Sequence, residues 1–122
     1  MVATARRAAA LLREEGLAVG VVNCRFVKPM DQDLLRRLAA SHRLLVTLEE
    51  NSLRGGFGTG VYETMHEMDL HGPRLIHLGL PDRFIDHGSR EALLREIGLA
   101  PDQIAARVRQ ALVAGTAAGE GR

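Results

Sequence analysis

Residues 45–61, LVTLEENSLRGGFGTGV, combine three local patterns in one short stretch. An apolar run ends in Glu49, Glu50 and Asn51, and glycines follow at positions 55, 56, 58 and 60. Helical spacing of apolar residues then begins at Val61. A strand, a glycine-rich turn and a helix in this order are typical of an open α/β sheet, in which ligands bind beyond the carboxyl ends of the strands. The stretch therefore predicts a β–α unit. Its loop either binds phosphate or only connects the strand to the helix.

Apolar runs and amphipathic segments alternate along the rest of the chain. Three apolar runs have the length of strands: residues 18–24, with a continuation to Val27, residues 44–48 and residues 74–78. Helical spacing occurs in five segments: residues 3–15, the segment after Asp31, residues 61–68, the segment between Ser89 and Gly98, and the segment after Pro101. Asp31 and Ser89 are predicted N-caps, and Gly16 and Gly98 are predicted helix stops.

The resulting order, α-β-α-β-α-β-α-α, predicts a three-layer α/β/α domain with a mainly parallel sheet. A sheet of three strands is small for five helices, and the first predicted element is a helix. We therefore expect the first strand of the domain to be missing and the chain to be an N-terminally truncated piece of something larger. The predicted domain covers residues 1–114, and the small, polar residues 115–122 are expected to form a disordered tail.

The composition is that of one ordinary globular domain of 122 residues. The net charge of +1 gives no sign of steering toward nucleic acid or a membrane surface. Cys24 is the only cysteine, which excludes a disulfide framework or a cysteine-based zinc site within one chain and fits a reducing cytoplasm. No window approaches the roughly 18 consecutive apolar residues of a membrane span.

The glycine loop does not match a nucleotide-binding fingerprint. Counted from Gly56, the third glycine of G-x-G-x-x-G is replaced by Val61, and counted from Gly58 it is replaced by Glu63. No Gly-Lys-Ser/Thr sequence occurs, and the turn before the first glycine is too long for the fingerprint. We interpret the glycines as positions that allow positive φ and close packing of helix on sheet.

The polar residues do not assemble into a catalytic set. Glu49 and Glu50 would point to opposite faces of a strand, so one of them is expected to face a helix start or a neighbouring domain. Arg25 and Lys28 lie three residues apart in an extended segment, which argues against a shared phosphate clamp. The five histidines, at positions 42, 66, 71, 77 and 87, show no H-x-x-x-H or H-E-x-x-H spacing, so no metal site is expected.

A second polar cluster, DRFIDHGSR at residues 82–90, contains an aspartate, a histidine and a serine. A catalytic triad is not predicted, because the G-x-S-x-G elbow that would expose the nucleophile is absent. Ser89 is better explained as a helix cap, and Phe84 and Ile85 as an anchor onto a core or a partner surface.

Four blocks, in this order and spacing, resemble one family: RFVKPMD at residues 25–31, residues 45–51, GGFG at residues 55–58, and GLPD with HGSR at residues 79–82 and 87–90. The chain is similar, from about residue 1 to about residue 112, to the C-terminal (third) domain of the 1-deoxy-D-xylulose-5-phosphate synthases, in the transketolase C-terminal-domain family.

This resemblance implies a parent enzyme that uses thiamine diphosphate and Mg²⁺ in isoprenoid biosynthesis. The family condenses pyruvate with glyceraldehyde 3-phosphate and releases carbon dioxide, and the cofactor supplies the difficult chemistry. The cofactor and the main catalytic groups belong to the first two domains, so no catalytic, cofactor-binding or metal-binding residue is carried over to this chain. The implied role is a supporting one in a cytoplasmic homodimer, inactive when isolated and without a nucleic-acid or membrane partner.

Six polar residues are the expected contacts with the other domains: Arg25, Glu49, Glu50, Asn51, Arg83 and His87. Two alternatives stay open at this point. The chain could be the corresponding domain of a transketolase or of a 2-oxoacid dehydrogenase beta subunit, or a free-standing module that binds a small anion at the glycine loop.

Overall fold

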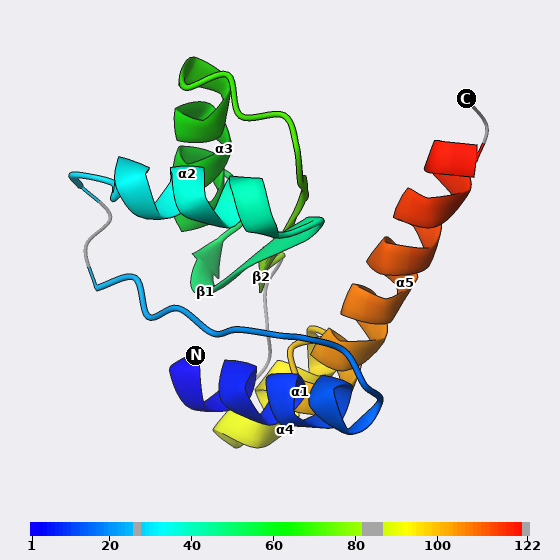
Figure 1. Cartoon of the computed structure of the whole chain (residues 1–122). Helices are drawn as coiled ribbons and strands as arrows, with labels where there is room; N and C mark the ends of the chain where they lie inside the picture. The colour runs from blue at the N-terminus through cyan, green and yellow to red at the C-terminus, as the bar shows by residue number, and fades with distance from the viewer. Residues whose placement is uncertain (26–27, 82–86, 121–122) are drawn as a thin grey trace.

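The computed structural model describes residues 1–25, 28–81 and 87–120. Within these ranges the chain forms five helices and a two-stranded sheet (Figure 1). In chain order the elements are α1 (Val2–Glu14), α2 (Gln32–Ser41), β1 (Leu44–Ser52), α3 (Phe57–Glu67), β2 (Arg74–Leu80), α4 (Arg90–Glu96) and α5 (Pro101–Glu120).

The two strands are parallel, as predicted, and α3 is the crossover between them. Their register pairs Leu44 with Arg74 and continues to Leu48 with Leu78. The pairing becomes irregular after this point and resumes where Ser52 faces Leu80. The irregularity lies where β1 approaches the glycine loop, so the carboxyl end of the strand is the part that departs from a regular ladder.

Helices cover both faces of the sheet (Figure 1). On one face, Leu45 and Leu75 pack against buried residues of α2 and α3, namely Leu35, Val61 and Met65. On the other face, Val46 and Leu78 pack against α1, α4 and the first turns of α5, through Ala8, Leu94 and Ile104. Because alternate strand residues point to opposite faces, the apolar runs of both strands are buried on both sides. The predicted three-layer α/β/α fold is confirmed.

The predicted helix ends are confirmed by their hydrogen bonds. The Asp31 carboxylate accepts from the Leu34 backbone N–H at 2.9 Å, and the Ser89 hydroxyl oxygen accepts from the Ala92 N–H at 3.2 Å. Gly98 follows α4 with φ of +81°, the left-handed conformation that glycine adopts without a steric penalty.

The strand predicted at residues 18–24 is wrong within the described residues, which show no strand there. Leu17 and Val19 pack against the cluster formed by α1 and α5, and Val22 is 46% exposed. The Arg13 guanidinium donates to the Val19 carbonyl at 2.9 Å, so a side chain binds one backbone group of this segment. Alternating valines predict an extended backbone, but a strand also requires a neighbouring strand for its ladder. The continuation to Val27 lies outside the described residues.

Four elements are longer than predicted, and one of them is β2, which ends at Leu80 instead of Leu78. β1 extends to Ser52, so Glu49 and Glu50 are strand residues, and α3 begins at Phe57 within the glycine-rich stretch. α5 extends to Glu120, so residues 115–120 are helical where the sequence predicts a disordered tail. None of the helices that the structure describes combines the length and the apolarity needed to span a lipid bilayer.

Candidate functional site

Three polar side chains lie on the sheet face beneath the first turn of α3. Thr47 and Glu49 are two residues apart on β1 and share this face, and the register places His77 of β2 beside Thr47. Thr47 and Glu49 are each only 6% exposed. Because buried polar groups need partners, this cluster determines what the carboxyl end of the sheet can do.

Glu49 is bound to the start of α3. Its Oε2 accepts a hydrogen bond from the Phe57 backbone N–H at 2.7 Å, and its Oε1 accepts one from the Gly58 N–H at 2.9 Å. The first N–H groups of a helix have no partner within the helix and lie at the positive end of its dipole, where a carboxylate is stabilising. The prediction that one of the two glutamates faces a helix start is confirmed.

Two glycines of the loop, Gly56 and Gly58, are required by close approach. A Cβ at Gly56 would lie 2.5 Å from Glu49 Oε2, and a Cβ at Gly58 would lie 2.6 Å from Thr47 Oγ1 and overlap His77 Nδ1. Gly55 has φ of +68°. Both parts of the interpretation, positive φ and close packing of helix on sheet, are therefore confirmed.

The start of α3 is consequently a poor site for the diphosphate of a thiamine cofactor. The position that an anion would take is filled by the Glu49 carboxylate, and the backbone around Gly56 and Gly58 packs directly on the sheet. A second anion there would be repelled by the first. Among the described residues, no group of three or more His, Cys, Asp and Glu side chains is placed to hold a metal ion.

Thr47 and His77 do not form a nucleophile and base pair that a substrate can reach. The Thr47 hydroxyl is buried and has no hydrogen-bond partner among the described residues, and Gly58 of α3 packs directly over both side chains. General acid–base or nucleophilic catalysis requires the reacting groups to contact the substrate. The cluster is therefore part of the helix–sheet interface.

Glu50 points to the opposite face of the sheet. Its Oε1 accepts a hydrogen bond from the Arg90 guanidinium at the start of α4, 40 residues later in the chain. This hydrogen bond, together with the positive charge of Arg90, lowers the pKa of the Glu50 carboxyl in spite of partial desolvation. The expectation that the two glutamates point to opposite faces is confirmed, so they do not act on one substrate atom.

A hollow of about 280 Å³ lies beside this ion pair at the carboxyl end of the sheet. Its polar lining consists of Glu50, His87 and Arg90, and its apolar lining of Leu80, Leu93, Leu94 and Ile97. The structure therefore brings together two of the residues predicted to contact other domains, Glu50 and His87. Glu50 neutralises Arg90, so among the described lining residues this arginine is not a free cation for an acidic ligand.

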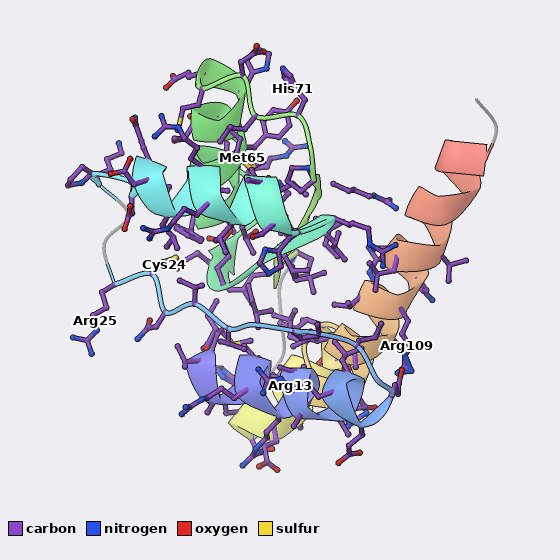
Figure 2. The ribbon with its side chains drawn as sticks, viewed as in Figure 1. Arg13, Cys24, Arg25, Met65, His71 and Arg109 are labelled. Atoms are coloured by element: carbon purple, nitrogen blue, oxygen red, sulfur yellow. The ribbon has the colours of Figure 1, made fainter. Side chains whose placement is uncertain are left out.

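The other predicted contact residues are placed separately. Asn51 is exposed at the end of β1, and Arg25 is exposed in the segment between α1 and α2, where its side chain points away from the rest of the molecule (Figure 2). Arg83, like the predicted anchor of Phe84 and Ile85, lies outside the described residues. That these residues contact another domain stays a prediction.

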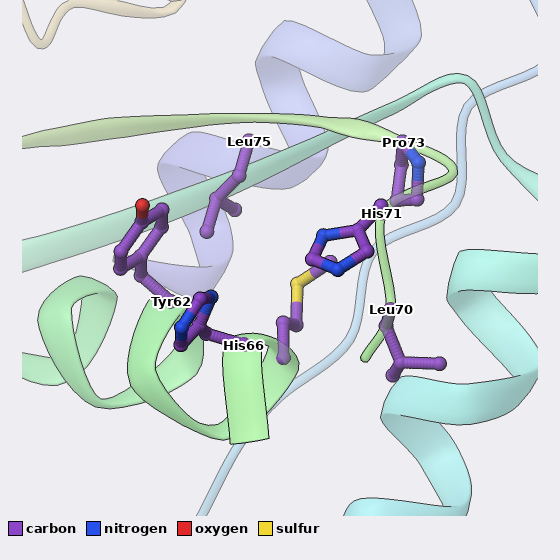
Figure 3. Close-up of a pocket in the computed structure, with 7 residues that line it drawn as sticks. Tyr62, His66, Leu70, His71, Pro73 and Leu75 are labelled. Carbon is purple, nitrogen blue, oxygen red and sulfur yellow. The ribbon is translucent and has the colours of Figure 1, made fainter. Parts of the chain in front are cut away.

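A second hollow, of about 200 Å³, lies at the other end of α3 (Figure 3). It is lined by Tyr62, Met65, His66, Leu70, His71, Pro73 and Leu75. The His66 and His71 rings lie edge to face, with centroids 6.3 Å apart. Sequence reasoning missed this pair because the two residues are five apart and meet only through the turn that ends α3, so helical spacing gives no signal.

Comparison with known proteins agrees with the fold. The model of the family described as "Transketolase, C-terminal domain" matches residues 1–104. The 1-deoxy-D-xylulose-5-phosphate synthase of Thioalkalivibrio sulfidiphilus is 53% identical over 104 residues, which are 85% of this chain and 16% of that protein. The synthase of Aquifex aeolicus is 47% identical over 111 residues, 91% of this chain and 18% of that protein.

A solved structure described as "Split gene transketolase, inactive beta4 tetramer" has the same fold, with a TM-score of 0.82. It is 35% identical to this chain, and the match covers 92% of this chain and 36% of that one. The chain thus spans less than a fifth of the two curated relatives and about a third of this structure. The chain belongs to the transketolase C-terminal domain family.

Proposed function

We propose that this chain acts as the C-terminal domain of a 1-deoxy-D-xylulose-5-phosphate synthase and supports the domains that perform catalysis. The observation that carries the proposal is the 53% identity over 104 residues to such a synthase, compared with 35% to the split-gene transketolase. The parent reaction would join pyruvate and glyceraldehyde 3-phosphate with loss of carbon dioxide. A transketolase, or a 2-oxoacid dehydrogenase beta subunit, is the alternative parent within the same family.

The proposed role in the parent is structural. Thiamine diphosphate and Mg²⁺ would be held by the other domains, since the start of α3 is filled by Glu49. The cofactor would supply the carbanion chemistry when bound there. What this chain's own residues do is fix the carboxyl end of the sheet: Glu49 holds α3 on one face, and Glu50 holds α4 on the other.

The contact surface we propose is the carboxyl end of the sheet, with Glu50, Asn51 and His87, together with Arg25. Asn51, His87 and Arg25 are exposed, and their polar groups suit the mixed surface of an interface between domains. The Glu49 carboxylate already accepts hydrogen bonds from the start of α3, so its contribution to a contact with another domain would be indirect. Arg83 belongs to the proposal on sequence grounds alone.

The parent is proposed to be a cytoplasmic homodimer. The exposed free thiol of Cys24 suits a reducing compartment. The split-gene transketolase structure is described as a tetramer, which supports an oligomeric parent.

The direct test is reconstitution of activity. We expect no product from the isolated chain with thiamine diphosphate, Mg²⁺, pyruvate and glyceraldehyde 3-phosphate. Adding the chain to a synthase that lacks its third domain should restore turnover, whereas adding it to a transketolase with the same deletion should not. Turnover by the isolated chain would overturn the supporting role. If the chain restores turnover to the truncated transketolase and not to the truncated synthase, it belongs to the alternative parent.

The contact surface can be tested in the same assay. Asn51→Ala and His87→Ala should weaken reconstitution by raising the concentration of chain needed for half-maximal activity. Arg37→Ala, an exposed substitution on α2, is the control and should have no effect. An equal effect of all three substitutions would contradict the proposed surface.

The free-standing anion-binding module can be tested by calorimetry with phosphate, nucleotides and pyruvate. We expect no heat of binding at the glycine loop, because the Glu49 carboxylate already accepts from its N–H groups. Phosphate binding that is lost in Gly56→Ala would support the module instead.

A further inference from the structure

We propose that the outer edge of β1 and the extended residues 18–24 form an insertion site for one further β-strand, which the rest of the parent enzyme supplies and which runs parallel to β1. The outer edge is the side of β1 that does not pair with β2. The inference rests on the proposed function only for the source of the strand, because the insertion site itself consists of backbone groups of this chain.

Residues 18–24 have the pattern of a strand without a ladder. Leu17, Val19 and Val21 are half-buried, whereas residues 18, 20 and 22 are exposed, and this period of two is that of a β-strand. Within the described residues, the only hydrogen bonds to the backbone of this segment are those that the Val19 carbonyl accepts from the Arg13 guanidinium. The segment therefore presents unpaired N–H and C=O groups, as the edge of a sheet does.

This segment follows β1 and not β2. Leu17 and Val19 pack against the buried cluster of α1 and α5 that also contacts Val46 of β1, and no described residue of β2 belongs to that cluster. Further along the chain, Met30 packs on the opposite face of the sheet, in the cluster that includes Leu45. The chain thus passes β1 from one face to the other. No backbone hydrogen bond joins it to β1 within the described residues, so the outer edge of β1 is open to a strand.

The direction of α1 determines where the added strand lies. The Met1 amino group is 3.6 Å from Glu50 Oε1, near the carboxyl end of β1, whereas Leu12 lies in the cluster that contacts Leu44 at the amino end. α1 is therefore antiparallel to β1, and the segment that follows it returns in the direction of β1 (Figure 1). A helix and a strand in these directions are the second half of a β–α–β crossover, whose first strand lies in the same sheet. This arrangement places the added strand between β1 and residues 18–24, parallel to both.

Helices on both faces determine the chemistry of the occupant. α1 and α5 cover one face of β1, and α2 and α3 cover the other. A strand buried on both faces is a continuous apolar run, and it contains no proline because every N–H group of a central strand is needed for a ladder. Val22, which is 46% exposed, is an apolar side chain of the insertion site that lacks cover in this chain.

The rest of the parent enzyme is the source that suits this chemistry. The match covers only 16% of the Thioalkalivibrio synthase, so most of that polypeptide lies outside it and can supply an apolar strand. A second copy of this chain suits the insertion site less well. Its β1 carries Glu49 and Glu50, and its β2 carries Arg74 and His77, and these side chains would have to be buried without partners.

The test uses a synthetic peptide of about six alternating valine and isoleucine residues, with lysines at both ends for solubility. When the peptide is added to the full chain, backbone amide exchange should slow at least about tenfold in residues 18–24 and at the β1 amides that do not bond to β2. The same peptide with a central proline is the control and should give no protection. Protection of only one of the two segments, or of neither, would overturn the proposal.

N-methylated peptides separate insertion between two segments from addition to one edge. Alternate residues of a strand direct their N–H and C=O groups to opposite neighbours, so methylation of every second amide blocks one edge of the peptide. The two complementary methylated peptides should each bind at least about tenfold more weakly than the parent peptide, because each loses hydrogen bonds to one flank. Full affinity of either methylated peptide would show one-sided pairing and overturn the insertion site.

Two neighbouring substitutions in the chain provide a matched pair. Gly20→Pro and Val21→Pro each remove one backbone N–H group from the extended segment. Because successive N–H groups of a strand point to opposite sides, only one of the two should face the inserted strand. One variant should therefore bind the peptide at least several-fold more weakly, and the other should bind as the unaltered chain does. Equal affinities of the two variants would contradict the predicted ladder.

The outcome can be told apart from that of the reconstitution assay. A chain that binds the peptide but restores turnover to neither truncated enzyme would contradict the proposed function and leave the insertion site intact. A chain that restores turnover but does not bind the peptide would overturn the insertion site alone. Self-association that protects the same amides and that the peptide does not reduce would identify a second copy as the occupant and overturn the proposal.

Discussion

The buried carboxylate of Glu49 accepts a hydrogen bond of 2.9 Å from the backbone N–H of Gly58, nine residues later in the chain. This contact joins the end of β1 to the first turn of α3. A glycine at position 58 allows the helix to approach the sheet, and the glutamate provides the negative charge that the helix start requires. The loop that resembles a phosphate cradle in sequence is thus filled by a side chain of the chain itself.

Replacing Glu49 should destabilise the domain. Glu49→Ala removes two charge-assisted hydrogen bonds and leaves buried N–H groups without partners, which should lower the free energy of unfolding by about 2–3 kcal/mol. Glu50→Gln, the neighbouring substitution, breaks a half-exposed ion pair and should cost about 1 kcal/mol or less. Urea denaturation at pH 7 gives both values. Equal losses at the two positions would contradict the role assigned to Glu49.

Substitution by alanine at two glycines of α3 should change the free energy of unfolding in opposite directions. Gly58→Ala places a methyl group against His77 and Thr47 and should lower the free energy of unfolding by about 1–3 kcal/mol. At Gly60 the nearest atom to an added Cβ is Met30 Cε at 3.6 Å, an ordinary contact. Gly60→Ala should therefore stabilise by about 0.5–1 kcal/mol through helix propensity. Thermal denaturation of the two variants checks this order of stability. A Gly58→Ala variant as stable as the unaltered chain would refute the close packing.

The ion pair between Glu50 and Arg90 should make stability depend on pH in the acid range. Because the pKa of Glu50 is lowered in the folded chain, the pair stabilises the fold above the ordinary glutamate range. This contribution is lost as the pH falls through the lowered pKa. The pair is half-exposed, so we expect no more than about 1 kcal/mol.

The measurement compares Arg90→Gln with the unaltered chain by urea denaturation between pH 7 and pH 3. The difference in unfolding free energy should shrink toward zero as the pH falls. Arg37→Gln, which removes an exposed positive charge from α2, is the control. A difference that stays constant with pH would show that Arg90 acts through packing instead of charge.

The chain should associate in solution. β1 and β2 bond to each other, and within the described residues neither has a further strand on its outer edge. Unpaired edges of a small sheet are templates for pairing with another chain. Sedimentation velocity at increasing concentrations should therefore show dimers or larger species. A monomer at all concentrations, with a sharp melting transition at high temperature, would contradict this prediction.

Local signals in the sequence determined much of this fold. The apolar runs that became β1 and β2, the caps at Asp31 and Ser89, and the stop at Gly98 depend on interactions within a few residues, so they could be predicted. The opposite orientation of Glu49 and Glu50 followed from strand geometry alone. The four sequence blocks indicated the family, which the comparison with known proteins confirmed.

Tertiary structure decided the remainder, because it depends on which segments become neighbours. The valines of residues 18–24 form no strand, since a ladder needs a partner that propensity cannot supply. The partners of Glu49 and Glu50, the start of α3 and Arg90, are distant in sequence and are set by packing of helices on both faces of the sheet. The meeting of His66 and His71 likewise required the turn at Asp69, whose backbone conformation no periodicity in the sequence reveals.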